Sequence, residues 1–187
     1  MSDPADAVQV AEFRAMFERT SSRVYAFARR QVDATTAEDV VADVYLVAWR
    51  RRVELPADPV PWLLVTARNA VRNHWRTRGR QDRVQAALAG VAHLAATSAA
   101  VDGVVVDRAV MVSALSALSP TDREALLLVA WDGLDRGAAA AVAGCTPATF
   151  AVRLHRARRA LHRQLQTADT IDDEITPSML RTTEDLR

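Results

Sequence analysis

The sequence of 187 residues predicts an all-α protein of two small helical domains joined by a flexible tether, with a helix-turn-helix in the C-terminal domain. The composition favours helices over sheets, because 50% of the residues are hydrophobic, alanine is abundant, only 5% are aromatic and glycine occurs 6 times. Apolar residues recur at helical spacing on both sides of an alanine-rich, weakly patterned stretch. We therefore expect domains at residues 8–80 and 107–165, a linker at residues 81–106 and an acidic tail at residues 166–187.

The first domain should begin with two helices. The first covers about residues 8–30 and ends before the turn sequence DATT. Thr36 with Asp39 has the form of a capping box, as does Thr35 with Glu38, so a second helix should begin near residue 37 and run to residue 51. The positions expected to be buried in the first helix are Val10, Phe13, Phe17, Val24, Phe27 and Ala28.

The outer face of the second helix should be both acidic and apolar. Residues 32–48 carry four acids and no base. Helical spacing turns Val40 and Val44 inward, and it turns Asp39, Asp43 and Leu46 outward. Such a face repels DNA, and it is either a protein-binding surface or an ordinary solvated one.

A third helix should carry a nucleic-acid surface. The segment VELPADPVP cannot continue a helix, whereas Pro61 suits the first turn of a helix over residues 62–78. Asparagine beside arginine can both donate to and accept from bases. Because a stiff loop precedes this helix and no helix-turn-helix surrounds it, the pattern is typical of a surface for separated strands. The residues of this face are Arg68, Asn69, Arg72, Asn73 and Arg76.

The stretch TPATFAVRLHRARRALHRQL, residues 146–165, has apolar side chains on one face and arginines on another, with no acid. Ala140, Gly144 and Phe150 stand where a helix-turn-helix needs a small residue, a turn glycine and a core residue. Thr146 can cap the second helix, with Pro147 at its first position. This helix should therefore enter the major groove of DNA. Base edges would be met by Ala148, Thr149 and Arg153, and phosphates by Arg156, Arg158, Arg159 and Arg163.

All 24 basic residues are arginine, which codon bias in a GC-rich genome explains as well as selection for guanidinium chemistry does. An exposed helix in such a chain looks basic whatever its role. The arginines are nevertheless concentrated: residues 68–83 hold six with one acid, and residues 153–163 hold five with none. This separation indicates two surfaces for polyanions.

Several classes of site are not expected. The single Cys145 excludes an internal disulfide, and the four histidines show no metal-ligand spacing. No phosphate-binding glycine loop or nucleophile motif occurs, so we expect no enzyme activity, no catalytic residue, no metal and no cofactor. No leader and no apolar run of membrane-spanning length are present, so we expect a cytoplasmic protein without membrane insertion.

The segments AEDVVADVYLVAWRR, PWLLVTARNAVRNHWRTRGR, LSPTDREALLLVAWDGL and TPATFAVRLHRARRAL together resemble the two conserved domains of bacterial group IV (extracytoplasmic-function, ECF) RNA polymerase sigma factors. The resemblance extends over about residues 13–165. It implies a promoter-specificity subunit whose partners are core RNA polymerase, promoter DNA and a sequestering anti-sigma protein. The second helix would dock on the clamp coiled coil of the largest polymerase subunit through Asp39, Val40, Asp43, Tyr45, Leu46 and Trp49.

The same resemblance assigns the DNA surfaces. Residues 53–61 and the polar face of the third helix would capture the melted minus-ten element, and the helix-turn-helix would read the minus-thirty-five element as duplex. The chain departs from the family in its short, proline-rich loop and in the sequence DRGAAAA, where the family commonly has an acidic helix with bulky apolar residues.

Two other functions stay open: a stand-alone DNA-binding regulator that uses residues 107–165, and a sigma-like decoy. The acidic tail is either solvated, or it folds back on the arginine helix and competes with DNA.

Overall fold

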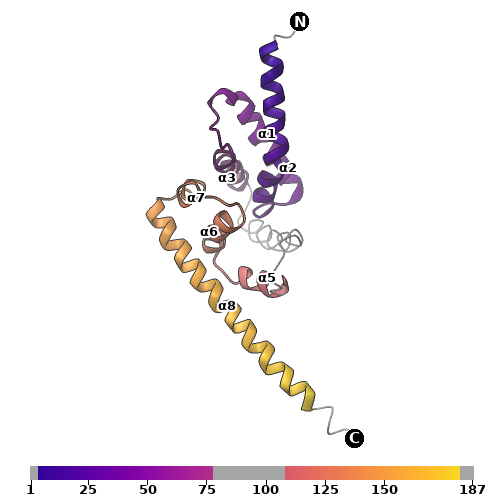
Figure 1. The fold of residues 1–187 in the computed structure, drawn as a ribbon, viewed down its shortest axis with the longest axis vertical. Helices are drawn as coiled ribbons and strands as arrows, with labels where there is room; N and C mark the ends of the chain where they lie inside the picture. The colour runs from indigo at the N-terminus through magenta and orange to yellow at the C-terminus, as the bar shows by residue number, and fades with distance from the viewer. Residues whose placement is uncertain (1–3, 78–107, 182–187) are drawn as a thin grey trace.

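The computed structural model describes the backbone of residues 4–77 and 108–181, and the side chains of residues 6–76 and 110–167. Every regular element within these ranges is a helix, so the predicted all-α fold is confirmed (Figure 1). The predicted linker, residues 81–106, lies outside the described residues.

The first helical unit is a three-helix arrangement in which α1, α2 and α3 all pack against one another. Its core contains Phe27, Val44 and Leu63, each at most 1% exposed. Burial of a side chain of this kind stabilises the fold by about 1.5–3 kcal/mol. The elements are α1 (Pro4–Arg29), α2 (Ala34–Arg50), the short 3₁₀ helix η1 (Arg52–Glu54) and α3 (Val60–Thr77).

Two details of this unit differ from the sequence predictions. The capping box is wrong: Asp33 caps α2, because its carboxylate accepts hydrogen bonds from the backbone N (2.9 Å) and Oγ1 (2.8 Å) of Thr36. The helix therefore begins one turn earlier than expected. Val10 and Phe17, predicted to be buried, are 51% and 40% exposed, since the nearby helices cover less of α1 than its apolar stripe predicts.

The second unit contains the predicted helix-turn-helix, formed by α7, a turn and α8. Gly144 ends α7 in the left-handed conformation with φ of 65°, a geometry that glycine adopts without steric cost. Oγ1 of Thr146 then accepts a hydrogen bond from the backbone N of Thr149 at 3.2 Å, which caps α8 as expected. The elements are α5 (Arg108–Ser116), α6 (Pro120–Ala130), α7 (Arg136–Ala143) and α8 (Pro147–Arg181).

Helix α8 runs past the predicted domain boundary at residue 165 and ends at Arg181, pointing away from both units (Figure 1). Neither glycine nor proline interrupts it between Pro147 and Pro177. A continuous helix cannot fold back on its own arginine face, so residues 166–181 do not cover that face.

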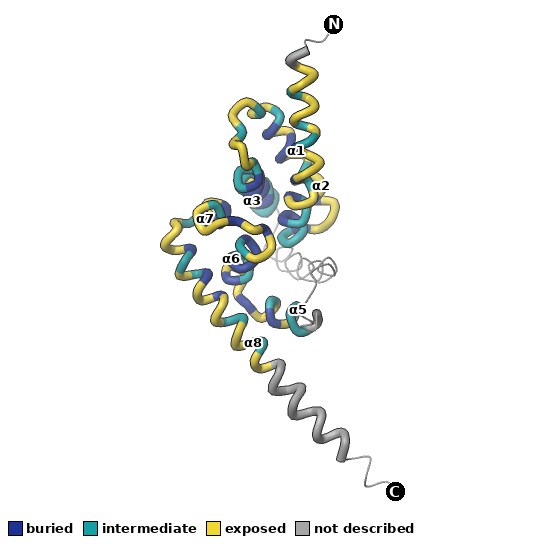
Figure 2. Tube along the Cα trace, in the orientation of Figure 1, coloured by how far each residue is buried: buried dark blue, intermediate teal, exposed yellow. Residues whose placement is uncertain are grey.

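The two units also pack against each other, which sequence patterning did not predict. Helix α7 lies between α3 of the first unit and α8 of the second. Most of the buried hydrophobic residues of both units, from Met16 to Ala157, form one continuous cluster. Figure 2 shows buried positions along the helices of both units.

Candidate nucleic-acid and polymerase interfaces

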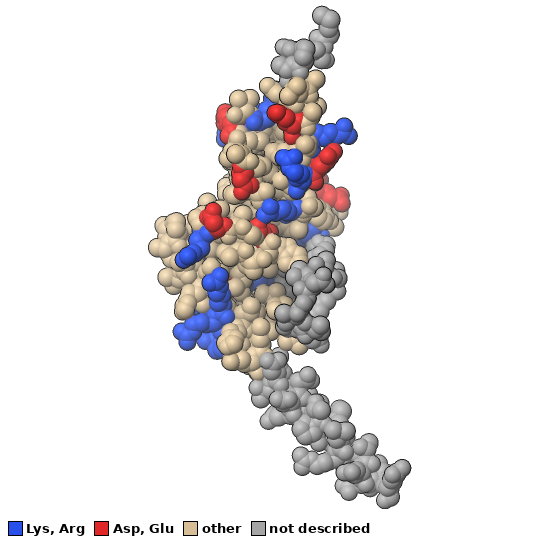
Figure 3. Space-filling view, viewed as in Figure 1, with Lys and Arg blue, Asp and Glu red and all other residues tan. Residues whose placement is uncertain are grey.

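The first half of α8 separates an apolar back from a basic front. Phe150, Leu154 and Ala157 are at most 4% exposed and anchor the helix in the core. The predicted DNA-facing residues Ala148, Thr149, Arg158 and Arg159 are exposed, and Arg153 is half-buried. Figure 3 shows basic side chains gathered over this part of α8, whereas acidic and basic side chains are mixed over the first unit.

Arg156 pairs with another residue of the protein, although 61% of its side chain is exposed. Its guanidinium binds Asp122 of α6 through Nη2 to Oδ1 at 2.7 Å and through Nε to both carboxylate oxygens at 3.0 and 3.2 Å. These bonds are the main reason why the pKa of Asp122 lies below its ordinary value, and a bond from Ser119 adds to the effect. Arg156 thus braces α8 against α6. Its role toward phosphate stays a prediction.

The predicted strand-binding face of α3 is partly open. Asn69, Arg72, Asn73 and Arg76 are exposed. Arg68 instead turns toward the second unit, where Nη1 donates to Oε1 of Glu124 at 3.1 Å and to the backbone carbonyl of Val142. Burial raises the pKa of Glu124, and the nearby Arg68 and Arg153 oppose this rise.

The predicted polymerase-binding residues of α2 divide between surface and core. Asp39, Asp43 and Leu46 are exposed, with Leu46 at 49%. Val40 and Tyr45 are buried, at 3% and 6% exposure, so neither reaches a partner in this conformation.

Aromatic side chains hold α2 against α1. The Tyr45 hydroxyl lies 2.7 Å from Thr20 Oγ1, and burial raises the pKa of this tyrosine. Trp49 is half-buried with its ring centroid 5.0 Å from that of Phe13. Phe17 packs edge-on against Tyr45, with the ring centroids 4.6 Å apart, and it is 40% exposed, whereas the sequence pattern had placed it in the core.

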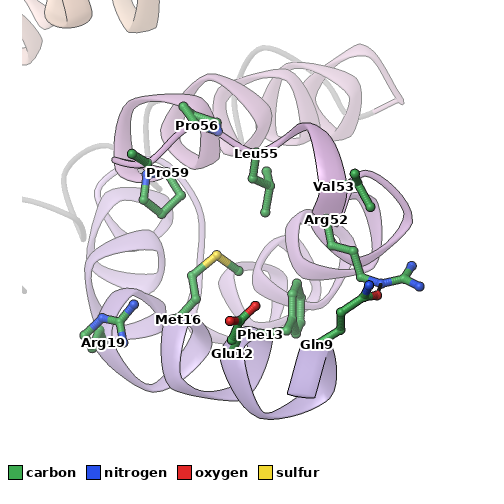
Figure 4. Close-up of a pocket in the computed structure, with 11 residues that line it drawn as sticks. Gln9, Glu12, Phe13, Met16, Arg19, Arg52, Val53, Leu55, Pro56 and Pro59 are labelled. Carbon is green, nitrogen blue, oxygen red and sulfur yellow. Dashed lines mark hydrogen bonds between the residues drawn. The ribbon is translucent and has the colours of Figure 1, made fainter. Parts of the chain in front are cut away.

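A cavity of about 430 Å³ opens between α1 and the proline-rich loop. Met16 and Leu55 point into it from opposite walls, and Gln9, Glu12 and Arg19 supply polar groups (Figure 4). Nε of Arg52 donates to Oε1 of Gln9 at 3.0 Å across one end. The sequence analysis expected this loop to take part in binding a separated strand, but no signal within α1 indicated that its side chains line a cavity with the loop.

Two negative findings apply to the described residues. No group of three or more His, Cys, Asp or Glu side chains there could hold a metal ion. No single helix there is long and apolar enough to cross a membrane. The residues of α7 and the first part of α8 pass that test only as a pair bent by 96°.

Comparison with known proteins assigns both helical units. Residues 16–81 match the family model described as Sigma-70 region 2, and residues 108–161 match the one described as Sigma-70, region 4. Two relatives are the ECF RNA polymerase sigma factor SigK of Mycobacterium sp. (strain KMS) and the RNA polymerase sigma factor SigK of Mycobacterium sp. (strain MCS). Each is 32% identical over 141 residues, which cover 67% of this chain and 71% of the relative. This chain belongs to the ECF sigma factors.

Two solved structures of similar proteins agree with the assignment of this chain to the sigma factors. One is the sigma factor RpoE in complex with the anti-sigma factor NepR from Bartonella quintana, at 27% identity and a TM-score of 0.59, covering 83% of this chain and 97% of that one. Another is CnrH in complex with the cytosolic domain of CnrY, at 25% identity and a TM-score of 0.55, covering 83% and 88%. The protein is therefore an alternative sigma factor that acts in transcription initiation. Helices α2 and α3 fall within region 2, and the helix-turn-helix falls within region 4.

Proposed function

We propose that this sigma factor reads duplex DNA at the minus-thirty-five element with the first turns of α8. The observation that carries the proposal is the exposure of Thr149, Arg158 and Arg159 on the second helix of a helix-turn-helix whose opposite face is buried. Ala148 and Thr149 lie at the N-terminal end, which in this motif meets base edges. Arg153, Arg158 and Arg159 supply charge toward bases and phosphates.

The open face of α3 binds the melted minus-ten strand. Asn69 and Asn73 offer amide donors and acceptors to unpaired bases, and Arg72 and Arg76 pair with phosphates. The cavity between α1 and the loop takes one unstacked base. Support comes from its apolar walls, which suit a base face, and from its rim of Gln9, Glu12 and Arg19, which suits a base edge.

The outer face of α2 docks on core RNA polymerase. Asp39, Asp43 and Leu46 form an exposed surface of charge and apolar area, and Phe17 of α1 extends the apolar part. Trp49 contributes its accessible edge. Val40 and Tyr45 act beneath this surface by holding α2 on α1.

The sigma factor works in the cytoplasm, by binding and without an enzyme activity of its own. An anti-sigma protein controls it. Support for this control comes from the similar proteins RpoE, solved with the anti-sigma factor NepR, and CnrH, solved with the cytosolic domain of CnrY.

Reconstituted transcription tests these assignments. Core polymerase with the wild-type chain should initiate at promoters selected from genomic DNA by that holoenzyme. Replacement of Arg158 by alanine should lower initiation without weakening core binding, whereas Leu46→Asp should abolish core binding. Arg14→Ala, at an exposed arginine of α1, is the matched control for loss of one positive charge. A chain that protects duplex DNA equally well without core polymerase would instead act as a stand-alone regulator.

A further inference from the structure

The centre of the outward side of α8 holds a valine where an arginine would be expected. Val152 follows the fully buried Phe150 by two positions, and an α-helix turns by about 100° per residue, so the two side chains lie on nearly opposite sides of α8. Val152 is 69% exposed, and among the large apolar side chains that the structure describes only Val53 is more exposed. Ala148 is exposed one turn earlier, on the same face. We call Ala148 and Val152 the apolar strip.

Charged groups flank the apolar strip and leave its centre uncovered. Arg156, one turn after Val152, pairs with Asp122 of α6 through Nη2 and Oδ1 at 2.7 Å. Arg153 is half-buried and lies about 100° around the helix from Val152. No acid occurs in residues 146–165, so the surroundings of the strip favour a polyanion as the occupant of this face.

The apolar strip can recognise one feature of a DNA duplex. Valine and alanine side chains carry neither a hydrogen-bond donor nor an acceptor. A polar base edge pressed against them loses its water without gaining a partner, which is unfavourable. Thymine is different, because its C5-methyl group projects into the major groove and makes favourable contacts with apolar side chains there.

We propose that Val152, with Ala148 beside it, selects thymine in the minus-thirty-five element through contact with the C5-methyl group. This inference rests on the proposed function, because it requires α8 to lie in the major groove of that element. The first turns of such a helix are the ones that reach base edges, and Val152 lies in the second turn of α8, which begins at Pro147. Arginines beside the strip hold the helix on the phosphates, and the strip selects the base.

Replacement of single thymidines by deoxyuridine tests the contact, because deoxyuridine lacks only the C5-methyl group. The holoenzyme, made from core polymerase and the full chain, binds a promoter duplex that the wild-type holoenzyme has selected from genomic DNA. Each thymidine of the minus-thirty-five element, in either strand, is replaced in turn, and the dissociation constant is measured by fluorescence anisotropy. The variant is Val152→Ala. The matched control is Val8→Ala, the same substitution at a 58% exposed valine of α1.

With the wild-type chain, deoxyuridine at one or two positions should weaken binding by about fourfold each, the effect of removing one methyl-sized group from an apolar contact. At these positions the loss for Val152→Ala should fall below about twofold, because the shorter side chain no longer reaches the methyl group. Val8→Ala should keep the wild-type loss. If no replacement weakens binding of the wild-type chain, or if Val152→Ala keeps the full loss, the inference is wrong.

Failure of the proposed function gives a different result. If α8 does not bind the minus-thirty-five duplex, Arg158→Ala and Val152→Ala will both bind like wild type, and both proposals are wrong. If Arg158→Ala weakens binding but removal of the methyl groups has no effect, only the thymine contact is wrong, and the strip is then free for a protein partner. Alanine suits an exposed helix position better than valine, so Val152→Ala should keep the circular dichroism of wild type.

Discussion

Arg123 offers a quantitative test of how the second unit is held together. Its guanidinium donates to the carbonyls of Leu115 at 2.8 Å, Ser116 at 2.9 Å and Leu118 at 3.1 Å. These groups lie at the end of α5 and in the turn that follows, where helix carbonyls run out of intrahelical donors, and the Leu115 carbonyl also accepts from the backbone N of Leu118 at 3.3 Å. Burial lowers the pKa of Arg123, although the group stays charged at neutral pH because its ordinary value is so high.

We expect Arg123→Met to lower the free energy of unfolding by about 2–3 kcal/mol. A hydrogen bond to a charged group contributes about 1.5–3 kcal/mol to stability. The combined contribution of the three bonds is smaller than the sum of three such values, because water reaches the part-exposed carbonyls. For a chain of this size the melting temperature should fall by about 4–12 °C.

Thermal unfolding followed by circular dichroism measures this change. Arg14→Met is the matched control, because the Arg14 side chain is 80% exposed and, among the described side chains, pairs just with Glu18 at i,i+4. That control should change stability by less than about 0.5 kcal/mol. Equal melting temperatures for the Arg123 variant and the control would refute the assignment of Arg123 as the joint between α5 and α6.

Three further predictions concern the interfaces. Tyr45→Phe removes the hydrogen bond to Thr20 and should lower the free energy of unfolding in urea by about 1 kcal/mol. It should leave the affinity for core polymerase within twofold, since the ring is buried beneath the proposed docking face of α2. Arg156 lowers the pKa of Asp122 in the folded protein. The stability that this ion pair contributes is therefore fully present when the pH is above the ordinary pKa of 3.8, and it is lost as the pH falls through the lowered pKa of the folded state. The stability difference between wild type and Asp122→Asn should therefore shrink on acidification from about pH 5 to pH 2, and a constant difference would contradict it. Arg158→Ala should reduce the slope of log affinity against log salt for duplex promoter DNA by about 0.9, if this residue contacts phosphate, and an unchanged slope would remove that contact.

Local chemistry made much of the fold predictable. The Thr146 and Pro147 start signal, the Gly144 turn and the burial of Phe150 depend on residues near one another in sequence, and all are present. The same kind of reasoning failed for the cap of α2, which the sequence pattern assigned to Thr36 or Thr35. Asp33 caps because its carboxylate binds both donors of Thr36.

Contacts between residues far apart in the chain could not be predicted from the sequence pattern. Arg30 and Asp132 are 102 positions apart, and Arg68 and Glu124 are 56 apart. Helical periodicity describes which side chains share a face, but it does not say which other helix that face meets. For this reason Arg68 was grouped with the open residues of α3, and the α1 wall of the cavity was missed.

The alanine-rich helix α7 restricts how this protein can vary. Ala139 and Ala140 are at most 1% exposed, in a helix that lies between α3 and α8. A larger side chain at either position would push one neighbour outward, at a typical cost of 1–3 kcal/mol for overpacking. Homologues that keep the two units in contact should therefore conserve alanine, glycine or serine at these positions, and those with bulky residues there should have lost the closed arrangement during divergence.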